Sequence, residues 1–283
     1  MDAAPYGLVE HAGPGVRRVL ARNPSPFTFT GTQTHIVGTG EVAVIDPGPD
    51  LPEHVEAILA ACRGERVTAI LVTHTHRDHS PASRALKAAT GAPIVGCVPL
   101  AIDDGGLSDE SFDIGYAPDR VLAEGEGVAG PGWTLRAVAT PGHTSNHLCF
   151  AYKEESALFS GDHVMGWSSS VVLPPDGRMA DYIASLVKLR ARNDRVYYPG
   201  HGLSVDAPGK LVRGFIAHRR QRESQILGLL EAGPAPIANL VERMYVGLDP
   251  RLFAAAGASV MAHLIDLDER GLARHADATW NLV

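Results

Sequence analysis

The run Thr73-His74-Thr75-His76-Arg77-Asp78-His79-Ser80 places three histidines and one aspartate within six consecutive positions. The residues from Thr68 to Val72 before it are apolar and β-prone, and the residues from Ser80 to Thr90 have a helical pattern. The sequence therefore predicts that this run lies at the carboxyl end of a buried strand, where α/β sheets place their ligands.

His74 and His76 are two positions apart, so in an extended backbone both imidazoles project to the same face and can converge on one ion. Asp78 and His79 come where the chain turns into the helix, so they face elsewhere and can serve a second ion. Imidazole together with carboxylate suits zinc or another first-row divalent metal. The alternative is a solvated loop rich in histidine, and four such ligands at this spacing argue against it.

Three later predicted strands also end in a turn with a metal-capable side chain, namely His143, Asp162 and His201. A glycine directly precedes each of them (Gly142, Gly161 and Gly200), which lets the backbone approach closely. Four strand ends of this kind in one chain predict a single metal site at the edge of a sheet.

The chain has 283 residues, which suggests one large or two modest domains, and 45% of them are hydrophobic, enough for a sizeable core. No apolar run reaches the roughly 18 residues that a membrane span needs. The N-terminus lacks the pattern of a secretory signal, so we expect a cytoplasmic protein with no membrane partner. The net charge of −7 argues against a surface generally coated with nucleic acid, although it allows a local basic patch. Three cysteines in apolar stretches are predicted to be buried free thiols: Cys62, Cys97 and Cys149.

The first hundred residues are predicted to alternate strand and helix. The predicted strands are 28–37, 41–45, 68–72 and 93–98, and the predicted helices are 51–62 and 80–90. Residues 100–132 are irregular, acidic and glycine-rich, and they form either a surface excursion or a flap over the site.

From Ala207 the pattern changes to helices, at 210–230, 237–245 and 251–267, followed by a short strand pair. This order is that of a winged-helix unit, so we predict a catalytic domain over residues 1–206 and a second domain over 207–283. Five Lys or Arg and His218 lie between Lys210 and Arg222, with no acid until Glu223. This basic helix either binds phosphates beside the site or is a solvated face that pairs with acids.

The pattern His74-x-His76-x-Asp78-His79, together with His143, Asp162 and His201, resembles the signature of the metallo-β-lactamase superfamily. The resemblance implies an α/β fold, an αββα sandwich with a dinuclear metal site at one edge. It also implies that His74, His76 and His143 hold one ion. Asp78, His79 and His201 would hold the other, and Asp162 would bridge the two. The bridging aspartate resembles the glyoxalase and nuclease branches, since true zinc β-lactamases often lack it.

Two Zn²⁺ ions are the expected cofactor, with Mn²⁺ or Fe²⁺ as alternatives. Such a pair holds a hydroxide at neutral pH and stabilises developing negative charge. Asp78 is the candidate that orients the hydroxide. A metal-bound water or His163 is a weak candidate for the leaving-group acid, and Trp167 is a candidate for lining the substrate pocket.

The C-terminal run His218-Arg219-Arg220-Gln221-Arg222-Glu223 resembles the β-lactamase-like protein 2 group, as do the stretches 23–28 and 160–167. Members of that group join the hydrolase domain to a small winged-helix-like domain, and the mitochondrial animal member is an endoribonuclease that prefers single strands. The first predicted substrate is therefore a phosphodiester in single-stranded RNA, bound by Arg219, Arg220 and Trp167.

Two other functions stay open at the level of sequence. The first is hydrolysis of a small-molecule ester, thioester or lactam, as in glyoxalase II or a weak β-lactamase. The scarcity of aromatic residues that could stack bases weakens the case for RNA. The second is a winged-helix regulator that only senses metal, although such a protein needs no bridging carboxylate. The pattern favours no particular oligomeric state.

Overall fold

The computed structural model describes residues 4–100 and 112–283, and these form two compact units. The first unit contains the described residues up to Thr140, together with residues 146–170 and 193–208. The second contains residues 141–145, 171–192 and 209–283. Two of its segments precede the predicted boundary between residues 206 and 207, and that boundary stays a prediction.

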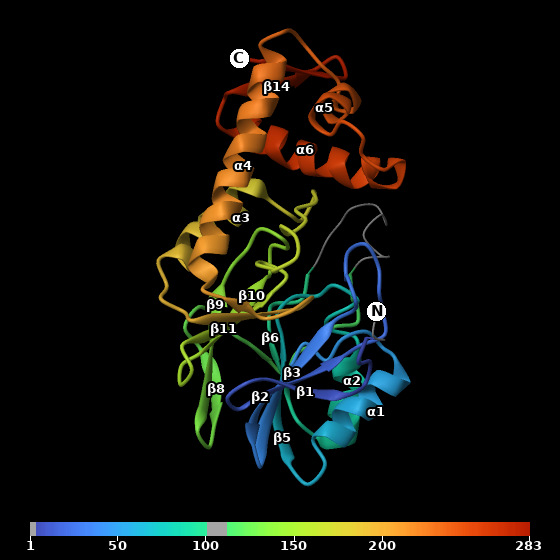
Figure 1. Cartoon of the computed structure of the whole chain (residues 1–283), viewed down its shortest axis with the longest axis vertical. Helices are drawn as coiled ribbons and strands as arrows, with labels where there is room; N and C mark the ends of the chain where they lie inside the picture. Colours follow the sequence, from blue (N-terminus) through green and yellow to red (C-terminus); the bar gives the residue numbers. More distant parts are fainter. Residues whose placement is uncertain (1–3, 101–111) are drawn as a thin grey trace. The chain divides into compact units, whose positions relative to one another are not determined.

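A seven-stranded sheet forms one layer of the first unit, with the strands in the order in which they occur along the chain. Its strands are β1 (Val9–Gly13), β2 (Val16–Leu20), β3 (Gln33–Thr39), β4 (Glu41–Ile45), β5 (Arg66–Val72), β6 (Ile94–Gly96) and β7 (Arg120–Val121). The pairs from β1 to β4 are antiparallel and those from β4 to β7 are parallel. Helices α1 (Pro52–Ala61) and α2 (Ala82–Thr90) make the connections into β5 and β6 (Figure 1).

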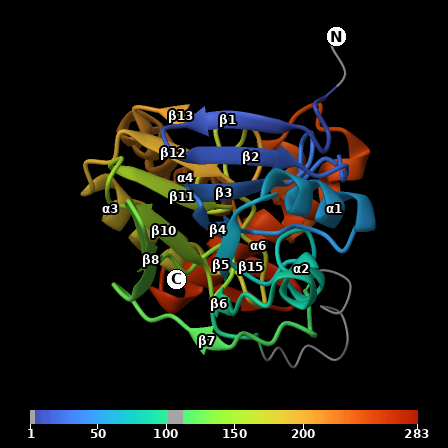
Figure 2. The same ribbon diagram turned by 90° about the horizontal axis from the view of Figure 1, so that it is seen from below.

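A six-stranded sheet forms the second layer, in the order β13-β12-β11-β10-β9-β8. Its strands are β8 (Gly127–Gly130), β9 (Trp133–Ala139), β10 (Leu148–Tyr152), β11 (Ala157–Gly161), β12 (Val196–Pro199) and β13 (Val205–Asp206). Only the pair β11 and β12 is parallel. Figure 2 shows β1, β2 and β3 of the first sheet lying side by side.

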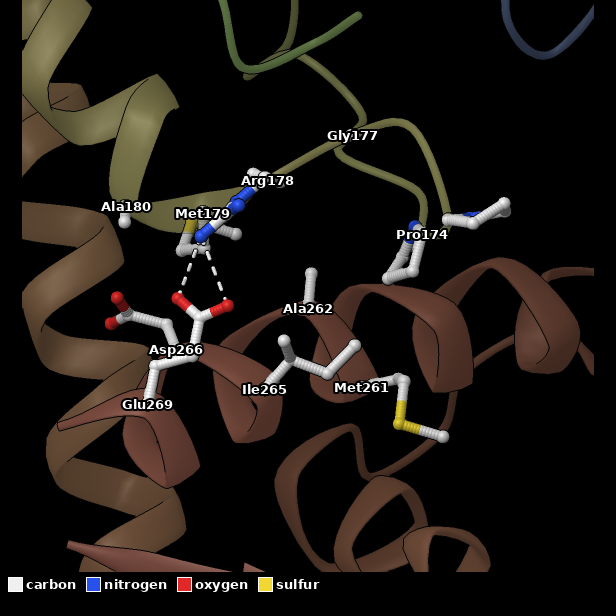
Figure 3. Close-up of a pocket in the computed structure, with 11 residues that line it drawn as sticks. Pro174, Gly177, Arg178, Met179, Ala180, Met261, Ala262, Ile265, Asp266 and Glu269 are labelled. Atoms are coloured by element: carbon white, nitrogen blue, oxygen red, sulfur yellow. Dashed lines mark hydrogen bonds and ion pairs between the residues drawn. The ribbon is translucent and has the colours of Figure 1, made fainter. Parts of the chain in front are cut away.

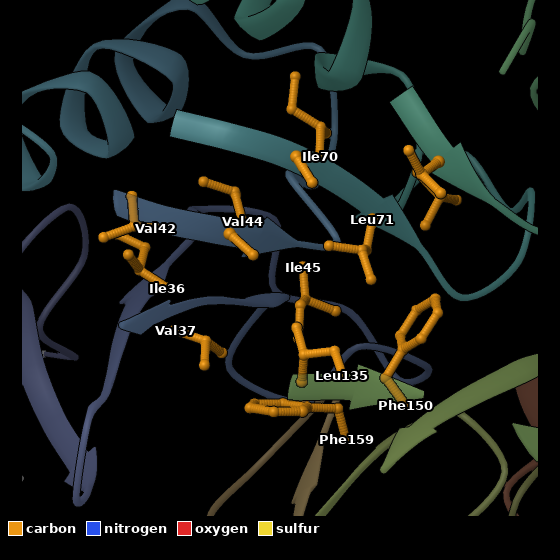
Figure 4. Packing of buried hydrophobic residues seen from close by; sticks show 14 of the residues in the cluster. Ile36, Val37, Val42, Val44, Ile45, Ile70, Leu71, Leu135, Phe150 and Phe159 are labelled. Carbon is orange, nitrogen blue, oxygen red and sulfur yellow. The ribbon is translucent and has the colours of Figure 1, made fainter. Parts of the chain in front are cut away.

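The core of the first unit lies between the two sheets. Val37, Ile45 and Leu71 of the first sheet point toward Leu135, Phe150 and Phe159 of the second (Figure 4). All six side chains are fully buried or nearly so. Burial of apolar surface is the main force that holds sheets face to face. Trp133 adds one polar link, because its Nε1 donates to the backbone oxygen of Glu41 at 2.9 Å.

The second unit is helical. Its elements are α3 (Met179–Arg190), α4 (Pro208–Leu230), α5 (Ile237–Met244), a 3₁₀ turn (Pro250–Leu252), α6 (Phe253–Glu269) and the hairpin β14 (Ala273–Ala276) and β15 (Thr279–Leu282). Leu240, Leu264 and Trp280 belong to its own buried core. The order helix, helix, helix, hairpin confirms the predicted winged-helix unit.

Three features of the first unit differ from the predicted elements. Strands β1 and β2 were not expected, and residues 28–32, predicted as strand, form a hydrogen-bonded loop before β3. Residues 101–111 of the predicted irregular stretch lie outside the described residues, and its later part carries β7 and β8.

The three cysteines are free and buried, as predicted. Within the described ranges, no helix is long and apolar enough to cross a membrane.

Candidate metal centre

The site is built at the carboxyl ends of two pairs of parallel strands. In the first sheet β4 ends directly before Asp46 and β5 directly before Thr73. In the second sheet β11 ends directly before Asp162, and β12 ends two residues before His201. Parallel neighbours end at the same edge of their sheet, so the loops that follow them meet there. The predicted placement of the ligands at strand ends is confirmed for these loops.

Six of the predicted ligands meet within the first unit. The ligand atoms of His74, His79 and Asp162 lie within 4.8 Å of one another. The same holds for Asp78, His79 and His201. His76 joins them, since its Nδ1 is 3.0 Å from His74 Nε2. We call these residues the carboxylate–histidine cluster: His74, His76, Asp78, His79, Asp162 and His201.

A hydroxyl fixes the tautomer of His74. Thr73 Oγ1 donates its single proton to Asp46 Oδ2 at 2.8 Å. Thr73 Oγ1 can therefore only accept from its other neighbour, His74 Nδ1, at 3.0 Å. The proton of the neutral His74 ring therefore lies on Nδ1, and its Nε2 lone pair faces the cluster. A partner on the second nitrogen that sets the donor nitrogen is typical of metal-binding histidine.

His79 and His201 are oriented in the same way. His79 Nδ1 donates to Asp46 Oδ2 at 3.0 Å, and His201 Nδ1 donates to the backbone oxygen of Gly31 at 3.1 Å. Their Nε2 atoms face the carboxylates: His201 Nε2 is 3.1 Å from Asp78 Oδ2, and His79 Nε2 is 3.4 Å from Asp162 Oδ1. Each ring thus presents one nitrogen to the cluster and uses the other for support.

The charges of the cluster are strongly coupled. Burial favours the neutral acid at Asp78 and Asp162, but the neighbouring His79 and His201 outweigh it and hold the pKa of both carboxyl groups well below the ordinary value. Burial also opposes the charge on the rings, and the carboxylates reverse this effect. They raise the pKa of His201 to about 10 and that of His79 well above 6.5.

These residues fit a pair of divalent ions. Among the described residues, the Nε2 atoms of His79 and His201 are buried and make no hydrogen bond. A buried polar atom without a hydrogen bond is costly, and two such atoms aimed at carboxylates provide a place for a cation. Imidazole nitrogens with carboxylate oxygens are the donor set that zinc and related metals take.

Sequence reasoning missed Asp46. The pattern Asp46-Pro47-Gly48-Pro49 indicates only a turn, yet Asp46 Oδ1 accepts from the backbone of Thr73 at 2.8 Å. Its Oδ2 accepts from both Thr73 Oγ1 and His79 Nδ1. Asp46 also has a φ of 48°, a conformation that few non-glycine residues adopt. The sequence offered one signal, since Asp46 directly follows an apolar strand, as the predicted ligands do.

The glycines before the later ligands have the predicted role of close approach. A Cβ at Gly200 would lie 2.6 Å from His79 Cε1 and 2.7 Å from Asp162 Oδ1. A Cβ at Gly161 would lie 2.7 Å from His147 Nε2. No side chain larger than a hydrogen fits at either position without displacing part of the site.

His147 and His163 support the loop after β11. His147 Nδ1 bonds to Thr140 Oγ1 at 2.9 Å, and its Nε2 accepts from the backbone of Asp162 at 3.2 Å. His147 is therefore a support residue. His163 is fully buried, and its backbone oxygen accepts from Ser170 Oγ at 2.8 Å. Its predicted part as leaving-group acid stays a prediction.

Each of the other predicted site residues has neighbours of its own. His143 is on residues 141–145 of the second unit, where its Nδ1 donates to the Val171 oxygen at 2.6 Å. Trp167 is 37% exposed and stacks on Phe29, with ring centroids 5.1 Å apart. Arg219 is only 4% exposed and lies over the Tyr182 ring, whereas Arg220 is exposed.

A separate pocket of about 420 Å³ lies within the second unit, between the loop before α3 and helix α6 (Figure 3). Met179, Met261 and Ile265 give it an apolar lining. At one side Arg178 Nη2 donates to both carboxylate oxygens of Glu269, at 2.9 and 2.8 Å. The pocket contains none of the predicted ligands.

Two facing mixed sheets with a histidine and aspartate cluster at the strand ends define a metal-dependent hydrolase fold. The model of the Metallo-beta-lactamase superfamily matches residues 28–201, and that of the Beta-lactamase associated winged helix domain matches residues 237–280. The chain belongs to the metallo-β-lactamase superfamily and is a hydrolase with a candidate metal site.

Three known proteins illustrate the relationship. The chain is 33% identical to the atrochrysone carboxyl ACP thioesterase dmxR1 of a Cryptosporiopsis species, covering 80% of this chain and 66% of the relative. It is 33% identical to the Beta-lactamase-like protein 2 homolog of Caenorhabditis elegans, over 79% and 73% of the two chains. The structure of a beta-lactamase domain protein from Burkholderia ambifaria matches with a TM-score of 0.82 at 21% identity, over 100% and 96%.

Proposed function

We propose that this protein is a dinuclear zinc hydrolase that cleaves an acyl substrate, with a thioester as first choice. The observation that carries the proposal is the carboxylate–histidine cluster, in which buried Nε2 atoms face two ionised carboxylates. Asp162 lies against both His79 and His201 at 3.4 Å, which suits a carboxylate that bridges two ions. Manganese or iron would suit the same donors.

The residues of the chain have distinct parts in this proposal. Two ions held at the cluster would supply an activated water as nucleophile and stabilise negative charge on the substrate. Asp78 stays ionised at neutral pH, so it can accept a hydrogen bond from that water and orient it. Asp46 and Thr73 hold the rings of His79 and His74, so the ligands need little rearrangement to act.

Three observations support an acyl substrate over RNA. A relative with 33% identity is named as a thioesterase. The net charge of −7 weakens the attraction of a polyanion to the protein. Trp167 and Phe29 present a stacked aromatic surface, and Trp167 packs on Gly202, directly after His201. That surface suits an apolar acyl group beside the cluster.

Single-stranded RNA is the second candidate. Three exposed cations on α4 favour it: Lys210, Arg213 and Arg220. Arg219, predicted to bind RNA, is buried over Tyr182, so it suits a packing role better than a contact with phosphate. A cytoplasmic location also stays part of the proposal, on the three free cysteines.

The test compares two substrates with the same zinc-loaded protein. Benzoyl-phosphopantetheine would be followed by thiol release, and a labelled single-stranded RNA by gel. The matched control is His201→Gln, which removes one proposed ligand. We expect thioester cleavage by the wild type alone and no RNA cleavage.

RNA cleavage without thiol release would overturn the choice of substrate. In that case Arg220→Ala should lower the salt slope of RNA binding by about one. Cleavage by His201→Gln at the wild-type rate would instead overturn the metal mechanism.

A further inference from the structure

Residues 112–116 of the first unit lie directly against the loop that carries the ligands from His74 to His79. Phe112 pairs with His76 in an antiparallel β-bridge, and their ring centroids are 4.7 Å apart. The Phe112 oxygen also accepts from Arg77 Nε at 3.3 Å. The His76 side chain is only partly buried, whereas His74 and His79 are fully buried. The Phe112 ring therefore covers the more exposed part of the ligand loop.

Asp113, the next residue, bonds to this loop at both of its ends. The N–H of Asp113 donates to the oxygen of Thr75, directly before His76, at 2.7 Å. Its side chain is buried, and its Oδ2 accepts at 2.8 Å from Ser80 Oγ, directly after His79. One aspartate thus connects the two residues that flank the ligand run 76–79.

Helix α2 holds the Asp113 carboxylate in place. Arg84 Nη1 donates to both carboxylate oxygens, at 2.9 and 2.8 Å, and the N–H of Gly115 donates to Oδ1 at 3.2 Å. Hydrogen bonds between charged groups are stronger than those between neutral groups, and a buried carboxylate that loses them is costly. The carboxylate therefore connects the ligand loop, α2 and the segment that carries Phe112.

We propose that Asp113 is a positioning residue for His76, which it holds by fixing Phe112 against the imidazole and by bonding to both ends of the ligand loop. Asp113 thereby raises the affinity of the ion that His76 binds. A ring already held in its binding orientation loses little side-chain entropy when the ion arrives. The proposal rests on the dinuclear site proposed above.

The same part of the chain offers a matched control. Asp119 is exposed, its Oδ1 accepts from Lys87 Nζ on α2, and its Oδ2 accepts from the N–H of Ile94 at 2.8 Å. Its partners belong to α2 and β6, whereas those of Asp113 include the ligand loop. Asp113→Ala and Asp119→Ala therefore each remove one carboxylate that pairs with a basic residue of α2, and only the first should affect His76.

The first measurement needs no metal. The ring current of Phe112, with its centroid 4.7 Å from that of His76, shifts the proton resonances of the imidazole. The His76 Hε1 signal of the metal-free protein therefore reports whether Phe112 is in place. His76→Gln assigns the signal, and Phe112→Leu gives the shift without the ring.

We expect Asp113→Ala to move the His76 signal toward its position in Phe112→Leu. Asp119→Ala should keep the wild-type position. A wild-type His76 signal in folded Asp113→Ala would overturn the proposal.

The second measurement determines the two zinc affinities by chelator competition, with bound zinc counted by mass spectrometry. We expect Asp113→Ala to weaken one ion by roughly 10-fold or more and to leave the other within about twofold. Asp119→Ala should match the wild type. Two unchanged zinc affinities in Asp113→Ala would overturn the proposal.

If Asp113→Ala does not fold by circular dichroism, Arg84→Ala decides the matter, because the Arg84 side chain is half-exposed and its removal leaves the bond from Ser80. Arg84→Ala should move the His76 signal in the same direction, and an unchanged signal would overturn the proposal. A wild type that binds fewer than two zinc ions would contradict the dinuclear function. The metal-free spectra would still support or overturn the positioning of His76.

Discussion

Two groups of histidines with charged neighbours occur in this protein, and they behave in opposite ways. In the carboxylate–histidine cluster, carboxylates surround His79 and His201 and raise their pKa. The second group, the α4 basic cluster, consists of His218, Arg219 and Arg222 on α4 and His263 on α6. Burial, and next the arginines, lower the pKa of His263 to about 3 and lower that of His218.

The difference teaches that the neighbours of a histidine, more than its burial, indicate its use. All the rings named here are at least partly buried, yet only those beside carboxylates have nitrogens oriented for an ion. His263 is surrounded by cations and is neutral at physiological pH, so it serves as a packing residue. Two of its arginine neighbours are themselves placed over tyrosine rings.

The largest expected effect is the loss of the bridging carboxylate. Asp162→Ala removes one of the two carboxylates that face the Nε2 atoms of His79 and His201. We therefore expect bound zinc to fall below two and turnover to fall by roughly 10³-fold or more. Metal analysis and the thioester assay check this, with the exposed Asp181→Ala as control. Full activity in Asp162→Ala would contradict the assignment of metal binding to the carboxylate–histidine cluster.

Zinc binding should release protons from the first group. At pH 8, His201 carries a proton in the metal-free protein because its pKa is raised to about 10, and the raised pKa of His79 favours a proton on that ring too. Zinc must displace these protons, so we expect more than one to be released per protein. Calorimetry in two buffers of different ionisation enthalpy measures the number. Release near zero would mean that the carboxylates do not raise the pKa of the rings.

The shifted pKa values of the cluster also determine how the stability of the metal-free protein depends on pH. A His with a raised pKa in the folded state stabilises the fold fully below 6.5, and this contribution disappears as the pH rises through about 10. The carboxylates act in the opposite range, since their stabilisation is lost as the pH falls below their ordinary values. The cluster should thus stabilise the metal-free fold between these limits.

A smaller effect is expected in the α4 basic cluster. The pKa of His263 is lowered in the folded state, so unfolding takes up a proton below pH 6.5 and the fold loses stability there. At pH 5 the loss is about 2 kcal/mol. His263→Leu should remove it, as measured by urea denaturation at pH 8 and pH 5. His275→Leu, an exposed change in the same unit, should keep the wild-type difference, and an equal loss in His263→Leu would contradict the comparison.

The fold and the ligand loops could be predicted because their signals are local. A buried strand followed by ligands, or by a glycine and a ligand, is visible within about ten residues of sequence. The supports of the rings are not local, since His79 and Asp46 are 33 residues apart and His201 and Gly31 are 170 apart. Only tertiary structure brings such pairs together, so Asp46 looked like an ordinary turn residue.

Residues 28–32 show how tertiary contacts overrule local preference. The sequence Phe27-Thr28-Phe29-Thr30 has the composition of a strand. Ser25 Oγ accepts from the backbone of Phe27 and Thr28, and Thr28 Oγ1 donates to the Asn23 oxygen, which together hold a loop. Phe29 consequently has a φ of 57° and stacks on Trp167. The strand pair β1 and β2 was missed for another reason, because β1 lacks regular alternation.

The close fit at Gly161 and Gly200 has a consequence for how this protein can evolve. Neither glycine leaves space for an added methyl group, so a substitution at either position would displace the predicted ligands and abolish the site. The aromatic residues Phe29 and Trp167 are half-exposed and stack on each other. A lineage can therefore exchange one substrate for another by altering these outer residues, while the metal chemistry passes unchanged from ancestor to descendant.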